Sequence, residues 1–185
     1  MTKSYTSPLS FQRLMLFRWR TVEWFFAVLA NRYRRWQWTR QGIQLGAHVH
    51  IGPRSYCASD GRVTIGDYVN FSSDVFISVT TGASLSIGRD SLVGPGTKFH
   101  TTNHAFDDLR RPIREQGDRP GPNQIVVGED VWIGSNCVIL SGVVIGSHTV
   151  IGAGSIVTAS IPPWVVAAGN PCRVLKSRRT EGTDP

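Results

Sequence analysis

The sequence lacks an uninterrupted apolar run of about 18 residues, the length that a membrane-spanning helix needs. The most apolar stretch, residues 9–29, is interrupted by Arg13, Arg18, Arg20 and Glu23. No small-residue cleavage signature stands out near this stretch, so we expect no secretory signal. These absences predict a protein of the cytoplasm or of the inner face of the membrane.

Cysteine is scarce, and acidic residues are outnumbered. The three cysteines, Cys57, Cys137 and Cys172, have no zinc-site spacing and cannot all pair with one another. We therefore expect free thiols in a reducing compartment. There are 13 acidic against 20 basic residues, a net charge of +7. Such a balance suits an anionic partner, such as an acidic membrane surface or a phosphorylated cofactor, although it can also serve solubility alone.

The N-terminal part contains a basic and aromatic segment that predicts one helix over residues 8–40. Ser7 is placed to cap this helix and Pro8 to open it. Six apolar side chains recur at roughly helical spacing: Leu14, Phe17, Val22, Phe25, Phe26 and Leu29. Such a helix can lie at a membrane interface, or it can pack against its own domain or a sister subunit, and both interpretations stay open.

After Gly42 the apolar period changes to six residues. The clearest series consists of Val127, Ile133, Ile139, Ile145, Ile151 and Val157. A fixed six-residue repeat fits neither a helix nor a simple hairpin, and it indicates a β-solenoid. If three short strands make one triangular coil, every eighteenth residue stacks on the same face, which places Val127 beneath Ile145.

Two short slips and one long break interrupt the repeat. The slips near Cys57 and Thr80 predict short insertions at corners. The polar, proline-containing break predicts a protruding loop over residues 100–124. We therefore expect an N-terminal helical segment (1–41), a β-helix domain (42–177) and a flexible tail (178–185).

The C-terminal repeats carry a family resemblance. Residues 126–177, with the ending IPPWVVAAGNPCRV, and the loop motif TTNHAFDD resemble the hexapeptide-repeat O-acetyltransferases. The most similar members are the galactoside, maltose and nodulation acetyltransferases and those of exopolysaccharide or lipopolysaccharide synthesis. The resemblance implies a mainly β fold, a left-handed parallel β-helix. It also implies transfer of an acetyl group from acetyl-CoA to a sugar hydroxyl, in a homotrimer with active sites between subunits.

The resemblance places the general base at His104. This residue stands in the motif Asn103-His104, sixteen residues after Gly88, as in the family. A histidine suits this role because its pKa near ~6.5 lets it accept a proton at neutral pH. His100 is the fallback. No cysteine is placed to suggest an acyl-enzyme, so we expect direct transfer.

The resemblance also implies the residues that bind donor and acceptor. The expected CoA-binding positions are Trp132, Ser135, Ala153, Thr158, Ala159, Arg173 and Lys176. Ala159 departs from the lysine that is frequent in the family, and Arg178 and Arg179 can compensate. Asn103 and Asp74 are expected on the acceptor side. Asp74 replaces a family asparagine, and it could either orient His104 or bind a sugar hydroxyl.

Several rival functions remain to be weighed. A carbonic anhydrase of this fold would need three histidines on zinc, a spacing that His100 and His104 do not give, so we expect no metal. The basic residues gather at the two ends and in the loop without a nucleic-acid-binding fold, so we expect no nucleic acid. An antibiotic-type O-acetyltransferase and a non-catalytic β-helix scaffold remain as alternatives.

Overall fold

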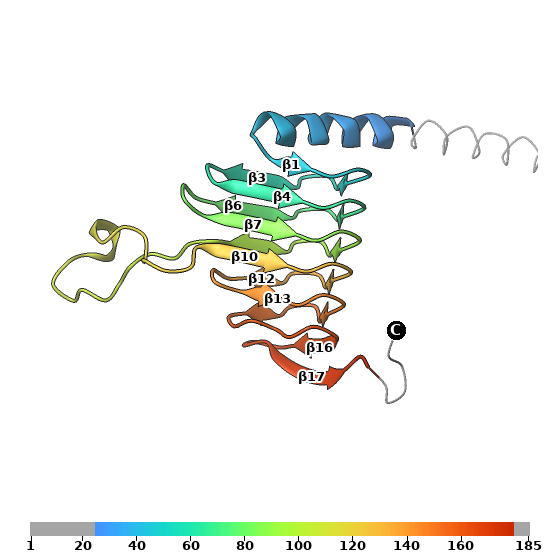
Figure 1. Cartoon of the computed structure of the whole chain (residues 1–185). Coiled ribbons are helices and arrows are strands. Elements are labelled where there is room, and N and C mark those ends of the chain that lie inside the picture. The colour runs from blue at the N-terminus through green and yellow to red at the C-terminus, as the bar shows by residue number, and fades with distance from the viewer. Residues whose placement is uncertain (1–24, 180–185) are drawn as a thin grey trace, which may run out of the picture.

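The computed structural model describes residues 25–179, which form a helix followed by a parallel β-helix (Figure 1). Equivalent strands of successive coils pair into three sheets, here called A, B and C. Sheet A consists of β1 (Gln44–Leu45), β4 (Arg62–Ile65), β7 (Ser84–Ile87), β10 (Gln124–Val127) and β13 (Val144–Ile145). Sheet B consists of β2 (His50–Ile51), β5 (Asn70–Phe71), β8 (Leu92–Val93), β11 (Trp132–Ile133), β14 (Val150–Ile151), β16 (Val165–Ala168) and β17 (Arg173–Ser177). Sheet C consists of β3 (Tyr56–Ser59), β6 (Phe76–Val79), β9 (Lys98–His100), β12 (Val138–Ile139) and β15 (Ile156–Val157).

The core is the aliphatic ladder that the six-residue period predicts. Val127 pairs with Ile145 in sheet A, and Ile133 pairs with Ile151 in sheet B. These side chains are buried, with relative exposures of 2% or less. Burial of apolar surface contributes roughly 25 cal/mol per Å², so this continuous stack is the main term that stabilises the coils. The predicted stacking is confirmed.

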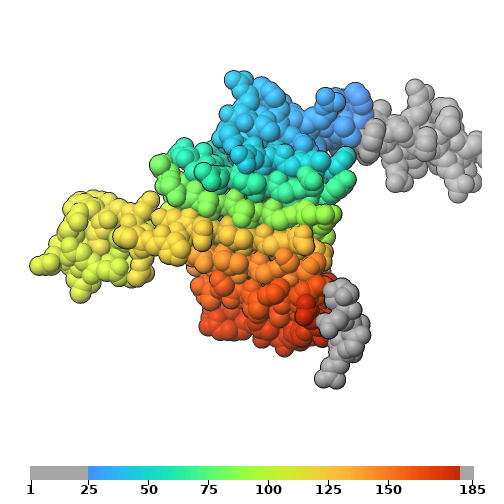
Figure 2. All heavy atoms as spheres, in the orientation of Figure 1, coloured from blue at the N-terminus to red at the C-terminus, as the bar shows by residue number. Residues whose placement is uncertain are grey.

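The first coils are longer than eighteen residues, as the two slips in the sequence predict. Leu45 pairs with Ile65, and Ile65 pairs with Ile87. The extra residues lengthen the strands of sheets A and C and the turns between them, so the buried register continues unbroken. The long break forms a loop between β9 and β10 that contains the 3₁₀ helix η1 (Ile113–Glu115). This loop projects far from the β-helix (Figures 1 and 2).

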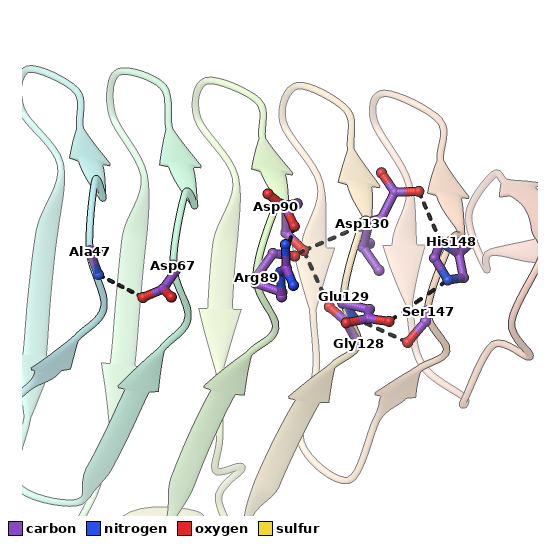
Figure 3. Close-up of polar contacts among 11 residues, drawn as sticks. Ala47, Asp67, Arg89, Asp90, Gly128, Glu129, Asp130, Ser147 and His148 are labelled. Carbon is purple, nitrogen blue, oxygen red and sulfur yellow. Dashed lines mark hydrogen bonds and ion pairs between the residues drawn. The ribbon is translucent and has the colours of Figure 1, made fainter.

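The three corners of the triangle are named here after the sheets they join. At the A–B corner, the turn residue of successive coils has a left-handed backbone and is often not glycine: His48, Tyr68, Asp90, Asp130, His148 and Trp164. Hydrogen bonds and ion pairs connect these turns from one coil to the next (Figure 3). His148 Nδ1 lies 2.9 Å from Asp130, and its ring stacks on Trp164 with centroids 4.1 Å apart. His148 is thus half-buried at this corner.

The N-terminal helix (residues 25–40) closes the open end of the β-helix. Its inner face donates hydrogen bonds to carbonyls of the first coil, from Arg34 to Ile51 (2.6 Å) and from Arg35 to Val49 (3.0 Å). Trp38 is buried and packs against Phe71. These contacts satisfy backbone groups that have no further coil to pair with.

The aromatic stripe of this helix faces away from the β-helix. Its large side chains are 44% to 63% exposed: Phe25, Phe26, Leu29, Tyr33 and Trp36. The helix therefore packs on its own domain through polar side chains and Trp38 rather than through the apolar positions seen in the sequence. The part of the predicted helix over residues 8–24 lies outside the described residues.

Candidate active site

A groove runs along sheet B and the B–C corner, where the sequence places part of the CoA site. It has a volume of about 470 Å³, and Trp132, Ser135 and Ala153 line it together. Trp132 stands on the outer face of β11 and is 55% exposed. The structure thus brings these three predicted residues to one surface.

Glycines keep this groove open. A Cβ atom on Gly94 would lie 2.6 Å from the backbone of Gly134, and one on Gly134 would lie 2.6 Å from the backbone of Ala153. Neighbouring coils therefore approach too closely for a side chain at these positions. The buried Thr97 side chain holds the turn at Gly134 in place, because its hydroxyl donates a hydrogen bond to the Gly134 carbonyl at 2.9 Å.

The cysteine under the groove is not a nucleophile. Cys137 is buried, and its Sγ lies 3.2 Å from the Gly152 carbonyl. Burial raises the pKa of the Cys137 thiol, which keeps it protonated and unreactive. Cys57 and Cys172 are likewise free and buried. This chemistry favours direct transfer over an acyl-enzyme.

His104 lies on the protruding loop at a different corner, the C–A corner. Its side chain is 75% exposed, and its Nδ1 lies 3.9 Å from Asp118 Oδ1. The loop is held at its base by backbone pairing, because the Arg119 amide donates to the Asn103 carbonyl at 2.8 Å. Asn103 and Arg119 also line a hollow of about 180 Å³ at this base. The loop thus presents an accessible imidazole next to a small polar hollow.

His100, the fallback base, has a different environment. It ends β9, is half-buried and packs against Phe76 with ring centroids 5.8 Å apart. Burial, with a smaller effect from Lys98, lowers the pKa of His100. Its partly covered ring makes it less accessible to a substrate than His104.

Asp74 has a partner that the sequence did not suggest. It stands at the B–C corner with a left-handed backbone, and Arg54 donates two hydrogen bonds to its carboxylate at 2.6 and 2.7 Å. This hydrogen-bonded pairing lowers the pKa of the Asp74 carboxyl. Within the chain, the carboxylate beside His104 belongs to Asp118 instead. Arg54 and Asp118 were both missed because neither belongs to a recognisable motif.

The remaining predicted CoA positions are divided between two places. Thr158 and Ala159 follow β15 at the C–A corner, where the His104 loop also leaves the β-helix. Arg173 and Lys176 are exposed on β17, which pairs antiparallel with β16 at the end of sheet B.

Residues 25–179 contain no cluster of three or more His, Cys, Asp or Glu side chains that could hold a metal.

Comparisons with known proteins agree with this fold. A family model described as bacterial transferase hexapeptide (six repeats) matches residues 124–159. The galactoside O-acetyltransferase of Escherichia coli K12 is 38% identical over 71% of this chain and 62% of its own length. A second E. coli K12 protein, WbbJ, provisionally named a lipopolysaccharide biosynthesis O-acetyl transferase, is 32% identical over 75% of this chain and 74% of its own.

A solved structure is similar over most of both chains. It is a hexapeptide-repeat acetyltransferase of Vibrio cholerae complexed with acetyl coenzyme A. The TM-score is 0.69 with 32% sequence identity, and the match covers 81% of this chain and 79% of that one. The chain nevertheless spans less than two thirds of the length of the galactoside enzyme.

Proposed function

The chain belongs to the hexapeptide-repeat acetyltransferases, and we propose that it transfers an acetyl group from acetyl-CoA to a sugar hydroxyl. The observation that carries this proposal is the groove lined by Trp132, Ser135 and Ala153. Its glycine-lined floor suits a thin pantetheine arm. Arg173 and Lys176 lie exposed on β17 of the same sheet, where they can meet phosphates through charge-assisted hydrogen bonds.

His104 is the proposed general base. Its Nε2 takes the proton of the acceptor hydroxyl, which makes the hydroxyl oxygen nucleophilic toward the thioester carbonyl. The C–O bond forms as the C–S bond breaks, and the imidazolium returns the proton to the departing thiolate. Acetyl-CoA supplies the activated acetyl group.

The two halves of this site lie at different corners of one triangular coil. The groove follows the B–C corner, whereas His104, Thr158 and Ala159 belong to the C–A corner. A second copy that places its C–A corner against the first copy's groove completes the site. We therefore propose a homotrimer with active sites between subunits, as the family resemblance implies.

The acceptor is proposed to be a carbohydrate of exopolysaccharide or lipopolysaccharide synthesis. Relatives named for galactosides and for lipopolysaccharide support this class. Asn103 at the loop base and Asp74, anchored by Arg54, are the proposed acceptor-binding residues. An antibiotic-type acceptor remains the alternative within the same chemistry.

Peripheral membrane contact is proposed for the N-terminal helix. Its outer face combines exposed aromatic rings with Arg32 and Arg40, and residues 25–40 contain no acidic side chain. No helix among residues 25–179 has the length and apolarity to cross a bilayer. The proposed location is therefore the inner face of the membrane, where acetyl-CoA is available.

The first experiment measures CoA release from acetyl-CoA over a panel of sugars and lipid-linked glycans. Wild type is compared with His104→Asn and with His48→Asn, a control histidine at the A–B corner where asparagine tolerates the left-handed backbone. We expect one acceptor class to be turned over, and a loss of at least about 100-fold in His104→Asn only. Turnover that survives in His104→Asn moves the base to His100. An absence of both turnover and CoA binding favours the scaffold alternative.

A further inference from the structure

The base of the protruding loop places an acidic residue opposite the proposed catalytic histidine. Residues 103–105 run antiparallel to residues 117–119, and His104 forms a bridge with Asp118. The Ala105 amide donates to the Gly117 carbonyl at 2.9 Å. This hydrogen bond and the one from the Arg119 amide to the Asn103 carbonyl lie on opposite sides of the pair formed by His104 and Asp118. His104 and Asp118 are therefore a non-hydrogen-bonded pair, in which the Cα atoms approach to about 4.5 Å and the side chains project on the same side.

The side chains of this pair face each other as the backbone pairing requires. The distance from His104 Nδ1 to Asp118 Oδ1 is 3.9 Å, longer than a hydrogen bond. Hydrogen bonds of catalytic groups often tighten only when substrate is bound. The nearby Arg119 forms its own ion pair with Asp107 at 3.7 Å, and the described residues give His104 no other carboxylate.

The rest of the loop is folded so that it holds the antiparallel segments at its root in place. The Gln116 side chain donates to the carbonyls of Asp108 and Arg111, both at 2.9 Å, and accepts from the Asp108 amide at 3.1 Å. Arg119 also stacks on Phe106. The pairing of His104 with Asp118 is thus built into the fold of the loop and does not depend on a flexible tip.

We propose that Asp118 is the positioning residue of the catalytic histidine, an inference that rests on the proposed function. Its carboxylate accepts the Nδ1–H of His104, which fixes the tautomer with a free lone pair on Nε2. It also stabilises the imidazolium that forms when Nε2 takes the acceptor proton. Asp118 thereby fills the role that the sequence offered to Asp74, which pairs with Arg54 instead.

The test compares Asp118→Asn with wild type in two readouts. In kinetics, we expect kcat to fall about 10-fold or more with an unchanged KM for acetyl-CoA, because Asp118 does not line the groove. In ¹⁵N NMR of the His104 imidazole, we expect the variant to lose the preference for the tautomer that carries its proton on Nδ1, because the carboxylate that accepts this proton is gone.

Two variants serve as controls. Asp118→Glu keeps the carboxylate and should restore most of the rate and the tautomer preference of His104. Asp90→Asn makes the same chemical change at the A–B corner, where the carboxylate pairs with Arg89, and should change neither readout.

The outcomes separate this inference from the proposed function. A lower rate in Asp118→Asn with an unchanged His104 tautomer would show a merely structural role and overturn the inference, as would no effect at all. If wild type acetylates no acceptor, the proposed function fails. The NMR spectra would still report whether Asp118 acts on His104.

Discussion

At the scale of single residues, glycines at the turns of the β-helix line the groove that is proposed to bind CoA. At the B–C corner beside the groove, Gly94, Gly134 and Gly152 lie one above another, each two residues before a residue with a left-handed backbone. The next coil lies against each of these glycines. These glycines also line the groove, where the absence of side chains leaves room for the proposed donor.

At this scale we predict that Gly134→Ala destabilises the protein. The new Cβ would meet backbone atoms of Ala153 at 2.6 and 2.8 Å, so the coils must shift. Overpacking of this kind costs about 1–3 kcal/mol in the free energy of unfolding. Thermal denaturation followed by circular dichroism measures it. Gly121→Ala, which meets nothing within 4 Å, is the control, and equal melting temperatures for the two variants would refute the argument.

Residues in the repeat could be predicted from the sequence, whereas residues in the loop could not. Val127 and Ile145 are buried opposite each other because a fixed period repeats the same local environment. Asp118 lies opposite His104 because of one unrepeated fold of a long loop, and no periodic signal reports it. Likewise, the resemblance supplied His104 but not the partner that Asp74 takes.

At the scale of elements, the N-terminal helix has two different faces. Arginines usually indicate a solvated face, but Arg34 and Arg35 point inward and bind carbonyls of the first coil. The sequence could not reveal this, because the need for donors arises only from the open edge of a β-helix. The aromatic residues are left outside, and Arg40 lies over the Trp36 ring at 5.1 Å.

We predict that this outer face binds anionic vesicles. Co-sedimentation with phosphatidylglycerol vesicles should exceed that with phosphatidylcholine vesicles and should weaken in high salt, because arginines and aromatic rings act together. Replacing Phe26 and Trp36 by alanine should reduce binding several-fold, at roughly 25 cal/mol per Å² of lost apolar contact.

The matched control for this experiment is Leu109→Ala, which removes a 96% exposed apolar side chain from the distant loop. Loss of binding in that variant would point to nonspecific adsorption. Tight self-association of wild type that disappears in the Phe26/Trp36 variant would instead assign the outer face to a sister subunit.

At the scale of the whole molecule, the β-helix separates the parts of its own proposed site. Each coil has three corners, and the long protruding loop, which carries His104, leaves from the C–A corner (Figure 1). The groove follows a different one, the B–C corner. A rigid stack of coils cannot fold back to join them. The proposed homotrimer, with its copies around a common axis, would bring the two parts together.

This geometry predicts that two inactive variants restore each other. His104→Asn removes the base, and Ser135→Tyr fills the groove, so trimers of either variant alone should be inactive. In trimers co-assembled from equal amounts, an intact His104 faces an intact groove of the neighbour at about one quarter of the sites, which should give that fraction of wild-type turnover. Light scattering should show a mass of about three chains for all preparations. A mixed preparation with no more activity than its components would place His104 and the groove of one site in the same chain, and the corner argument would then be wrong.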